Sequence, residues 1–337
     1  MDRRSEEVFE KLGGVILHEA ARRYGIRPDD LVKHGSFESY VFEFQRHGRS
    51  YILKLTHSLH RTPELVEGEI EWVLHLAESG VSVCRPVPAM AGEMVEVIDG
   101  RAVEELRDDY FIAYAFEKSP GRATGRKDWD DEMIETWGQT LGRLHRATRE
   151  YQPSREAIRR FHWDTDPCLS NLDYLASQPK VMNRWRETVA RLKSFPTDQS
   201  GYGLIHSDLH HGNFLFSDGA LHVFDCDDCH YGWFGFDIMI PLFYVMRDAE
   251  VDPEDIDYAW RFLDRFLSGY VSETSIDTVW IRRIPDFMKL REIDLYTTIV
   301  AEDAAEISGW CRRFMENRRY RIENDIPVIG LDLSEFA

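Results

Sequence analysis

The sequence has few cysteines, no long apolar run and no excess of positive charge. Its five cysteines are odd in number and scattered over 337 residues, which favours reduced thiols over a disulfide framework. The longest apolar stretches, such as Met239–Met246, are far too short to cross a bilayer. No apolar segment of a secretory signal follows the charged amino terminus. We therefore expect a cytoplasmic protein without a membrane partner.

The charge balance bears on which partners the protein can bind. Acidic residues outnumber basic residues by 60 to 41, which gives a formal net charge of −19. A field of this sign repels phosphate backbones, so we expect no nucleic-acid partner. The same field favours cationic small molecules near the surface. Hydrophobic residues make up 43% of the chain, which is enough for a sizeable core. The sequence carries no signal for an oligomeric state.

The first third of the chain is rich in strand patterns. A helix is predicted over residues 5–24, followed by strands over 40–44 and 50–55 that flank the turn His47-Gly48. The pattern then predicts a helix over residues 63–79, a hairpin over 94–105 around Asp99-Gly100, and a strand over 110–116. This part reads as a small β-rich N-terminal lobe, residues 1–116.

Beyond a linker at residues 117–122, the pattern is mainly helical. The predicted helices cover residues 129–151, 182–194, 237–246, 253–270 and 279–314. Short strands at 204–206 and 214–223 interrupt them, the second with a turn at Asp218-Gly219. We expect an α+β fold of two lobes, with a larger helical C-terminal lobe over residues 117–337.

Two polar clusters interrupt the apolar strands of this second lobe. They read His206-Ser207-Asp208-Leu209-His210-His211-Gly212-Asn213 and Phe224-Asp225-Cys226-Asp227-Asp228. Phosphoryl transfer depends on positioning and charge, and it needs carboxylates and amides of this kind. Asp208 is the candidate base that accepts or orients the proton of an attacking hydroxyl. Asn213 and Asp225 are candidate oxygen ligands for Mg²⁺.

The spacing of the first cluster, His206-x-Asp208-Leu209-x-x-x-Asn213, resembles the catalytic loop of kinases. With the second cluster and Phe236-Asp237-Ile238, it resembles the aminoglycoside phosphotransferase and choline-kinase-like family over residues 31–240. This resemblance implies a two-lobed protein-kinase-like fold with ATP and Mg²⁺ as cofactors. It also implies that Asp237 bonds to the backbone of the catalytic loop. We expect His206 to hold this loop as well, and we leave the role of His210 open.

The N-terminal lobe contains a candidate pair for nucleotide binding. Strand alternation places Lys54 on the face of Ile52, and helical spacing places Glu69 on the apolar stripe of the following helix. A carboxylate on a buried stripe is costly unless it is paired. We therefore predict an ion pair between Lys54 and Glu69. The resemblance implies that Lys54 aligns the phosphates of the nucleotide.

The remaining nucleotide contacts are predicted from the order of the strands. The segment His34–Tyr40 between the first two strands has one glycine, and Ser36 is the candidate phosphate contact. An ordinary hairpin with a polar tip is the alternative reading. The resemblance implies that adenine meets the backbone near Tyr114 and Phe116.

Three other functions are compatible with parts of the pattern. The main alternative is a Ser/Thr protein kinase of the same fold, but the few residues between Asp225 and Asp237 leave no room for a peptide-docking activation segment. A non-catalytic nucleotide-binding scaffold would be expected to lack one of the four residues Lys54, Asp208, Asn213 and Asp225. A metallohydrolase built on the loop histidines is the most remote alternative.

The motifs predict the chemical class of the acceptor. We expect a small-molecule kinase that phosphorylates a hydroxyl of a small polar molecule, with or without an amino group, such as an aminoglycoside, amino alcohol or sugar. Candidate acids that could face an aminated acceptor are Asp227, Asp228, Glu302, Asp303 and Glu306. Trp163 and Trp233 are more typical of core packing than of stacking on a ligand. Cys226 and Cys229 are predicted to be two buried thiols, since the lone C-x-x-C lacks a second pair.

Overall fold

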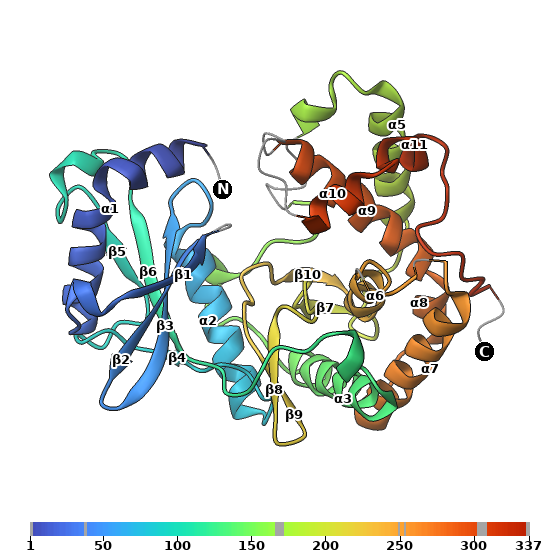
Figure 1. Ribbon diagram of the computed structural model, residues 1–337, viewed down its shortest axis with the longest axis horizontal. Helices are drawn as coiled ribbons and strands as arrows, with labels where there is room; N and C mark the ends of the chain where they lie inside the picture. Colours follow the sequence, from blue (N-terminus) through green and yellow to red (C-terminus); the bar gives the residue numbers. More distant parts are fainter. Residues whose placement is uncertain are drawn as a thin grey trace. The chain divides into compact units, whose positions relative to one another are not determined.

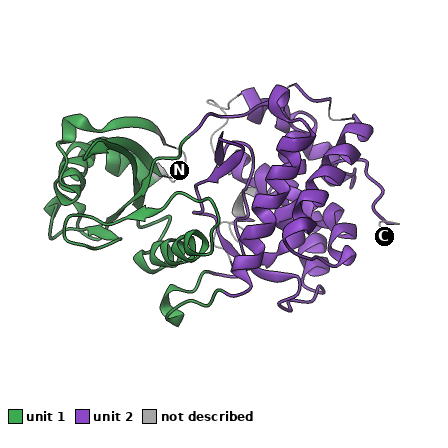
Figure 2. Cartoon of the chain, turned by 90° about the horizontal axis from the view of Figure 1, so that it is seen from below, with its two compact units in different colours: residues 1–120, 151–160 green, residues 121–150, 161–337 purple. Residues whose placement is uncertain are grey.

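The chain forms two compact units in the computed structural model, which describes residues 3–36, 39–165, 172–248, 250–252, 254–301 and 309–334. Unit 1 comprises Met1–Pro120 and Tyr151–Arg160, and unit 2 comprises Gly121–Glu150 and Phe161–Ala337 (Figure 2). The expected α+β class, with a β-rich first part and a helical second part, is confirmed. Within the described residues, no helix has the length and apolar character needed to cross a membrane.

Unit 1 is built on an antiparallel sheet (Figure 1). Its strands are β1 (Val32–Ser36), β2 (Tyr40–Arg46), β3 (Arg49–His57), β4 (Pro86–Val87), β5 (Glu96–Ile98) and β6 (Phe111–Glu117). The order is β1-β2-β3-β6-β4, and β5 also pairs with β6. The predicted turn between β2 and β3 is confirmed, because His47 and Gly48 both have positive φ angles, 51° and 77°.

Two helices pack on this sheet, α1 (Arg3–Tyr24) and α2 (Pro63–Glu78). The core that contains Ile16 and Tyr24 of α1 also contains Phe111, Ala113 and Ala115 of β6. The core that contains Val66 and Ile70 of α2 contains the alternate β6 residues Ile112 and Tyr114. Successive side chains of a strand point to opposite faces, so the two helices cover opposite faces of the sheet.

The predicted hairpin over residues 94–105 is wrong in its second strand. β5 pairs with β6 instead, in the register Val97 to Ile112, and residues 104–106 form a 3₁₀ turn. The Asp99 carboxylate accepts a hydrogen bond from the Arg101 amide (3.0 Å), and the Asp99 carbonyl accepts from the amides of Ala102 and Val103. These local bonds continue the turn, so the residues after Gly100 do not extend into a second strand of the hairpin.

Unit 2 is mainly helical and contains two small two-stranded sheets (Figure 1). The helices preceding the strands are α3 (Asp131–Thr148) and α5 (Pro179–Leu192). The strands are β7 (Tyr202–Ile205), β8 (Phe214–Ser217), β9 (Ala220–Val223) and β10 (His230–Trp233). The helices that follow are α6 (Phe234–Val245), α7 (Ile256–Glu273), α8 (Thr278–Arg282), α9 (Ile284–Ala301), α10 (Gly309–Met315) and α11 (Arg318–Glu323). β7 pairs with β10, and β8 forms a hairpin with β9 through the predicted turn at Asp218-Gly219.

Helices α3 and α7 approach each other closely at glycines. A Cβ atom added to Gly138 of α3 would lie 1.9 Å from the carbonyl oxygen of Phe266, and one added to Gly269 of α7 would lie 2.0 Å from that of Glu135. Only residues without a side chain allow this backbone contact. The close pair fixes α3, which supplies His145 to the site described below.

The single long helix predicted over residues 279–314 is wrong. The described residues form three helices there, α8, α9 and α10, and the first break falls at Arg283. Pro285 follows this break in the first turn of α9, where its missing N–H is tolerated, whereas it would interrupt a continuous helix. The predicted elements also omitted β10 and α11.

Candidate active site

The loop between β7 and β8 carries the catalytic-loop motif and is fixed from within unit 2 by a buried carboxylate. Asp237, in the first turn of α6, is fully buried. Its Oδ2 accepts a hydrogen bond from the His206 amide (2.9 Å), and its Oδ1 accepts one from the Ser207 amide (2.7 Å). Ser207 has a φ of 71°, which is uncommon for a residue with a side chain. Asp237 therefore holds the two residues that precede Asp208 in a fixed turn, and this turn sets the position of Asp208.

Helix α3 supports this carboxylate through a histidine. His145 is fully buried, and burial lowers its pKa. The neutral ring donates from Nε2 to Asp237 Oδ2 (3.0 Å) and accepts at Nδ1 from the hydroxyl of Tyr270 (2.9 Å). Burial disfavours the ionised form of Asp237, but the bond from His145 and the loop amides lower the pKa of this carboxyl. A chain of hydrogen bonds thus runs from α7 through α3 to the catalytic loop.

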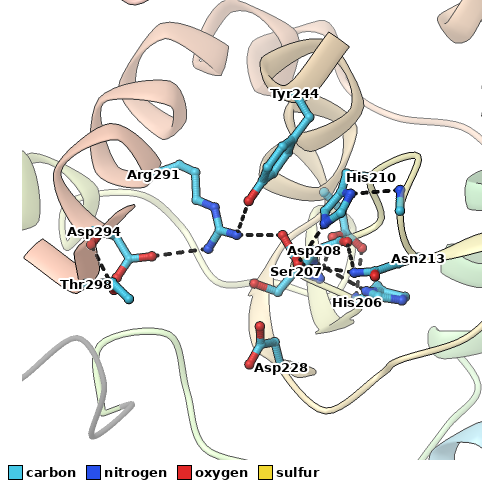
Figure 3. A network of polar contacts seen from close by, with 12 residues as sticks. His206, Ser207, Asp208, His210, Asn213, Asp228, Tyr244, Arg291, Asp294 and Thr298 are labelled. Atoms are coloured by element: carbon cyan, nitrogen blue, oxygen red, sulfur yellow. Dashed lines mark hydrogen bonds and ion pairs between the residues drawn. The ribbon is translucent and has the colours of Figure 1, made fainter. Parts of the chain in front are cut away.

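The Asp208 carboxylate is held at both oxygens (Figure 3). Arg291 of α9 donates from Nη2 to Oδ1 at 2.5 Å. Asn213 donates from Nδ2 to Oδ2 at 3.2 Å and also to the Asp208 carbonyl at 2.8 Å. The side chain of Asp208 remains 17% exposed, so the carboxylate is fixed in orientation but still accessible.

Neighbouring groups keep this carboxyl group ionised. Burial would raise the pKa of Asp208, but the guanidinium of Arg291 and the loop histidines His210 and His206 together lower the pKa below the usual range. Arg291 is itself held by the hydroxyl of Tyr244 (2.7 Å) and by Asp294 (3.2 Å). Asp208 is therefore ionised at neutral pH, as a group that accepts a proton must be.

The histidines of the loop hold its shape. His206 bridges Asp208 N, which donates to its Nδ1 (3.4 Å), and the Phe224 carbonyl, which accepts from its Nε2 (3.3 Å). His210 accepts from the Gly212 amide at Nδ1 (2.9 Å), so its Nε2 carries the proton that faces Asp208 Oδ2 at 3.4 Å. Among the described residues, no group of three or more His, Cys, Asp and Glu side chains is arranged to hold a metal ion.

The residues predicted to bind Mg²⁺ fit a hard cation by position and chemistry. Asn213 directly precedes β8 and Asp225 lies two residues after β9, at the same end of this hairpin. The Phe224 amide donates to the Asn213 carbonyl (3.0 Å), which keeps the two ends together. The amide nitrogen of Asn213 is committed to Asp208, so its oxygen is the atom left to coordinate a metal. Asp225 is exposed and has a φ of 62°. Both would supply the oxygen ligands that Mg²⁺ prefers.

A family model and a curated relative both match this chain over most of its length. The model of the phosphotransferase enzyme family matches residues 31–270. Amicoumacin kinase of Bacillus subtilis (strain 168) is 34% identical over 330 residues, which cover 95% of this chain and 94% of the relative.

The chain belongs to the phosphotransferase enzyme family.

Solved structures of the same kind support this assignment. The amicoumacin kinase hAmiN, in complex with AMP-PNP, Ca²⁺ and Ami, matches with a TM-score of 0.91 and 30% identity, covering 100% of both chains. A microcompartment-associated aminopropanol kinase shares the fold, with a TM-score of 0.70 and 20% identity over 94% of this chain and 99% of that one. The resemblance inferred from the motifs is confirmed, and so are the protein-kinase-like fold and the class of small-molecule kinase that acts on a hydroxyl.

In this phosphotransferase, unit 1 presents the residues predicted to meet the nucleotide. Lys54 of β3 is 7% exposed, and its register partner in β6 is Tyr114, on the α2 side of the sheet. The Lys54 ammonium lies 5.5 Å from the centre of the Tyr114 ring. Glu69 lies on the buried face of α2 and is fully buried. The structure thus buries both members of the predicted pair in one unit, and their pairing stays a prediction.

The side chains of the other predicted residues lie outside the described part of the chain or in the strands, core and turns of their own units. The side chain of Ser36 is outside the described residues, as are Glu302, Asp303 and Glu306. Phe116 of β6 is half-buried. Trp163 and Trp233 pack together in the core of unit 2, with ring centres 5.0 Å apart. The thiols of Cys226 and Cys229 are buried, and the two residues form a turn in which the Cys229 amide donates to the Cys226 carbonyl.

Sequence reasoning missed three residues of this site, namely His145, Tyr244 and Arg291. A charged residue inside an apolar helical pattern was the available signal for Arg291, because a buried cation requires a partner. For His145, the signal was its place on the buried face of a predicted helix beside Leu141 and Leu144. Neither signal names the partner, which lies 92 residues away for His145 and 83 for Arg291.

Proposed function

We propose that this enzyme transfers the γ-phosphoryl group of ATP, with Mg²⁺, to a hydroxyl of amicoumacin or of a closely similar small molecule. The observation that carries the chemistry is the Asp208 carboxylate, which is ionised, held at both oxygens and still accessible. The similarity to two amicoumacin kinases over nearly the whole chain supports the choice of acceptor. The nucleotide analogue and divalent ion bound by hAmiN support the choice of cofactors.

In the proposed reaction, the acceptor hydroxyl donates a hydrogen bond to the Asp208 carboxylate, which orients the oxygen toward the γ-phosphorus. A new O–P bond forms as the bond between the γ-phosphorus and the bridging oxygen breaks, and ADP leaves. The hydroxyl proton passes to Asp208 and then to solvent. Because Asp208 is a weak base, it orients the hydroxyl first and takes its proton late, as the loose transition state of phosphoryl transfer allows.

The other residues of the predicted site also have proposed roles. Asn213 and Asp225 would hold Mg²⁺, and this ion would neutralise charge on the phosphate oxygens when bound. Lys54 would pair with the phosphates of the nucleotide, and Glu69 would hold Lys54 in place. Ser36 and the backbone near Tyr114 and Phe116 remain the candidate contacts to the phosphates and the adenine.

The test is a screen for acceptor-dependent ATP consumption. The purified enzyme is assayed with ATP and Mg²⁺ against amicoumacin, aminopropanol, an aminoglycoside, choline, a sugar and a generic Ser/Thr protein substrate. We expect amicoumacin to give the highest kcat/KM and to gain one phosphoryl group by mass spectrometry. The protein substrate is the arm that tests the Ser/Thr kinase alternative.

A variant pair tests the assigned base. Asp208→Asn should lower kcat by about 1,000-fold or more while leaving the affinity for the nucleotide analogue within about twofold. Asp198→Asn removes a carboxylate from an exposed turn of the same unit and should leave kcat unchanged. Full turnover by Asp208→Asn would refute the role of Asp208, and exclusive phosphorylation of the protein substrate would refute the acceptor class.

A further inference from the structure

We propose that Arg291 of α9 is a positioning residue for phosphoryl transfer, which acts by fixing the rotation of the Asp208 carboxylate. The inference rests on the proposed function, since it assigns to Asp208 the role of orienting the acceptor hydroxyl. It goes beyond that function, because it brings into the reaction a helix that contains none of the catalytic motifs.

One torsion, about the Cβ–Cγ bond, sets the plane of the Asp208 carboxylate. The terminal torsion of an aspartate has a broad energy profile, so its carboxylate rotates unless both oxygens are held. Among the described residues, Oδ2 has the longer contacts, with Asn213 at 3.2 Å and His210 at 3.4 Å. The short contact of 2.5 Å is the one that Arg291 makes with Oδ1. Arg291 is therefore the main restraint on the carboxylate plane.

Arg291 can serve as a restraint because it is itself fixed. Its side chain is 12% exposed and lies between three acceptors, Asp208, Tyr244 and Asp294, as Figure 3 shows. The nitrogen that binds Asp208 also binds the hydroxyl of Tyr244 at 2.7 Å. A planar guanidinium with several bonds loses little freedom for each further bond it makes.

An aromatic stack holds Tyr244 in turn. The centre of its ring lies 4.3 Å from the centre of the His210 ring and 5.7 Å from that of the Trp310 ring in α10. Tyr244 therefore cannot turn its hydroxyl away from Arg291 without disturbing the loop histidine beside Asp208. The arginine, the tyrosine and the histidine form one clamp around the carboxylate (Figure 3).

Replacement of Arg291 should therefore affect the reaction more than binding. In Arg291→Met the carboxylate keeps its place on the loop but loses its fixed plane. We expect kcat to fall by about 100-fold, as for a small misplacement of a reacting group. The KM for ATP and for the acceptor should stay within about threefold. Arg291→Lys keeps a cation of similar reach and should recover about tenfold of the lost kcat.

Lys289 provides a matched control on the same helix. Its side chain is 11% exposed and makes a buried ion pair with Glu292 at 2.7 Å, away from Asp208. Lys289→Met removes a buried cation from α9 at nearly the same exposure. We expect it to lower the melting temperature at least as much as Arg291→Met does, but to leave kcat unchanged.

A double-mutant cycle decides whether Arg291 acts through Asp208. Asp208→Asn and Arg291→Met are measured singly and together with ATP, Mg²⁺ and the best acceptor of the screen. If Arg291 works through the carboxylate, Arg291→Met should cost less than about twofold in the Asp208→Asn background. A merely structural role would give the same factor in both backgrounds, which would overturn the inference. The thermal shifts of the same three variants should also be non-additive, because the two side chains touch.

The failure of the inference and that of the proposed function are distinguishable. If the wild-type enzyme turns over no acceptor, the proposed function fails and this inference fails with it. If the wild type is active but Arg291→Met is impaired no more than Lys289→Met, the inference alone is overturned. A loss of kcat specific to Arg291→Met, with partial recovery in Arg291→Lys and non-additivity with Asp208→Asn, supports it.

Discussion

Replacement of Asp237 by asparagine should destabilise unit 2 and lower kcat, although Asp237 is not one of the proposed reacting groups. Asp237 accepts hydrogen bonds from the amides of His206 and Ser207 and from Nε2 of His145, all without access to water. An asparagine of the same shape has only one oxygen. Its amide nitrogen would face a donor, either Ser207 N–H or the pair from His206 and His145.

The size of the effect follows from these bonds. In the better orientation, asparagine keeps the two bonds at the Oδ2 position but loses the charge that strengthens them, at a cost of about 1 kcal/mol each. The bond to the Ser207 amide is lost, which leaves a buried donor unpaired at a cost of about 2 kcal/mol. We therefore expect Asp237→Asn to lower the free energy of unfolding by about 4 kcal/mol.

The stability provided by Asp237 should also depend on pH. Because its pKa is lowered in the folded protein, this stability is present above the pKa of an unfolded aspartate. It is lost as the pH falls through the lower, folded pKa. Asp237→Asn should remove this part of the acid destabilisation.

Urea unfolding and steady-state kinetics check the prediction together. The unfolding midpoint of Asp237→Asn should fall at neutral pH, and the gap to wild type should narrow on acidification. The kcat should fall by about 100-fold at temperatures where the variant remains folded, because the loop that carries Asp208 is no longer held. An unfolding free energy within 1 kcal/mol of wild type, as expected for an ordinary surface substitution, would refute the role of Asp237 as the support of the loop.

Three further outcomes are expected. Ser207→Gly relieves a side chain at a φ of 71° and should raise the free energy of unfolding by about 0.5–1 kcal/mol in urea titrations; a loss of stability would show that the Ser207 side chain contributes more than the backbone costs. Gly138→Ala places a Cβ 1.9 Å from the Phe266 carbonyl and should cost about 3 kcal/mol or more in the same assay, whereas a wild-type midpoint would mean that α3 and α7 separate freely. Lys54→Met should lower kcat/KM for ATP by about 100-fold, and Lys118→Met, which alters an exposed ion pair of the same unit, should leave it unchanged; equal effects of the two would contradict the assignment of Lys54.

The parts of the site that the sequence predicts are those held together over short distances along the chain. Asp208 and Asn213 are five residues apart, and Asp237 contacts the loop over 30 residues. The hairpin of β8 and β9 joins Asn213 to the segment of Asp225 through a single backbone register. A sequence motif can predict such contacts, because the spacing of its residues along the chain fixes how far apart they lie in the loop.

The predictions from sequence were wrong where local contacts decide the end of an element. At Asp99 the turn signal was correct, but the side chain and carbonyl of this aspartate continue the turn and prevent a second strand. Over residues 279–314 the apolar pattern was sustained, yet Pro285 begins a new helix instead of kinking an old one. In both cases the pattern identifies the kind of residue but not the point at which an element ends.

Arg291 marks a different limit, because its role depends on a contact that no local pattern contains. Helix α9 carries Lys289, Arg291 and Glu292 among apolar residues, and buried charges of this kind must be paired. Residues two positions apart in a helix point about 200° apart, so Lys289 and Arg291 face different sides and cannot share one partner. Glu292 forms ion pairs with Lys289 and Arg318, whereas Arg291 forms its ion pair with Asp208. The sequence predicts that each charge has a partner, but only the fold pairs one cation of α9 with Glu292 and the other with Asp208. A helix outside every motif is thereby placed in direct contact with the proposed base.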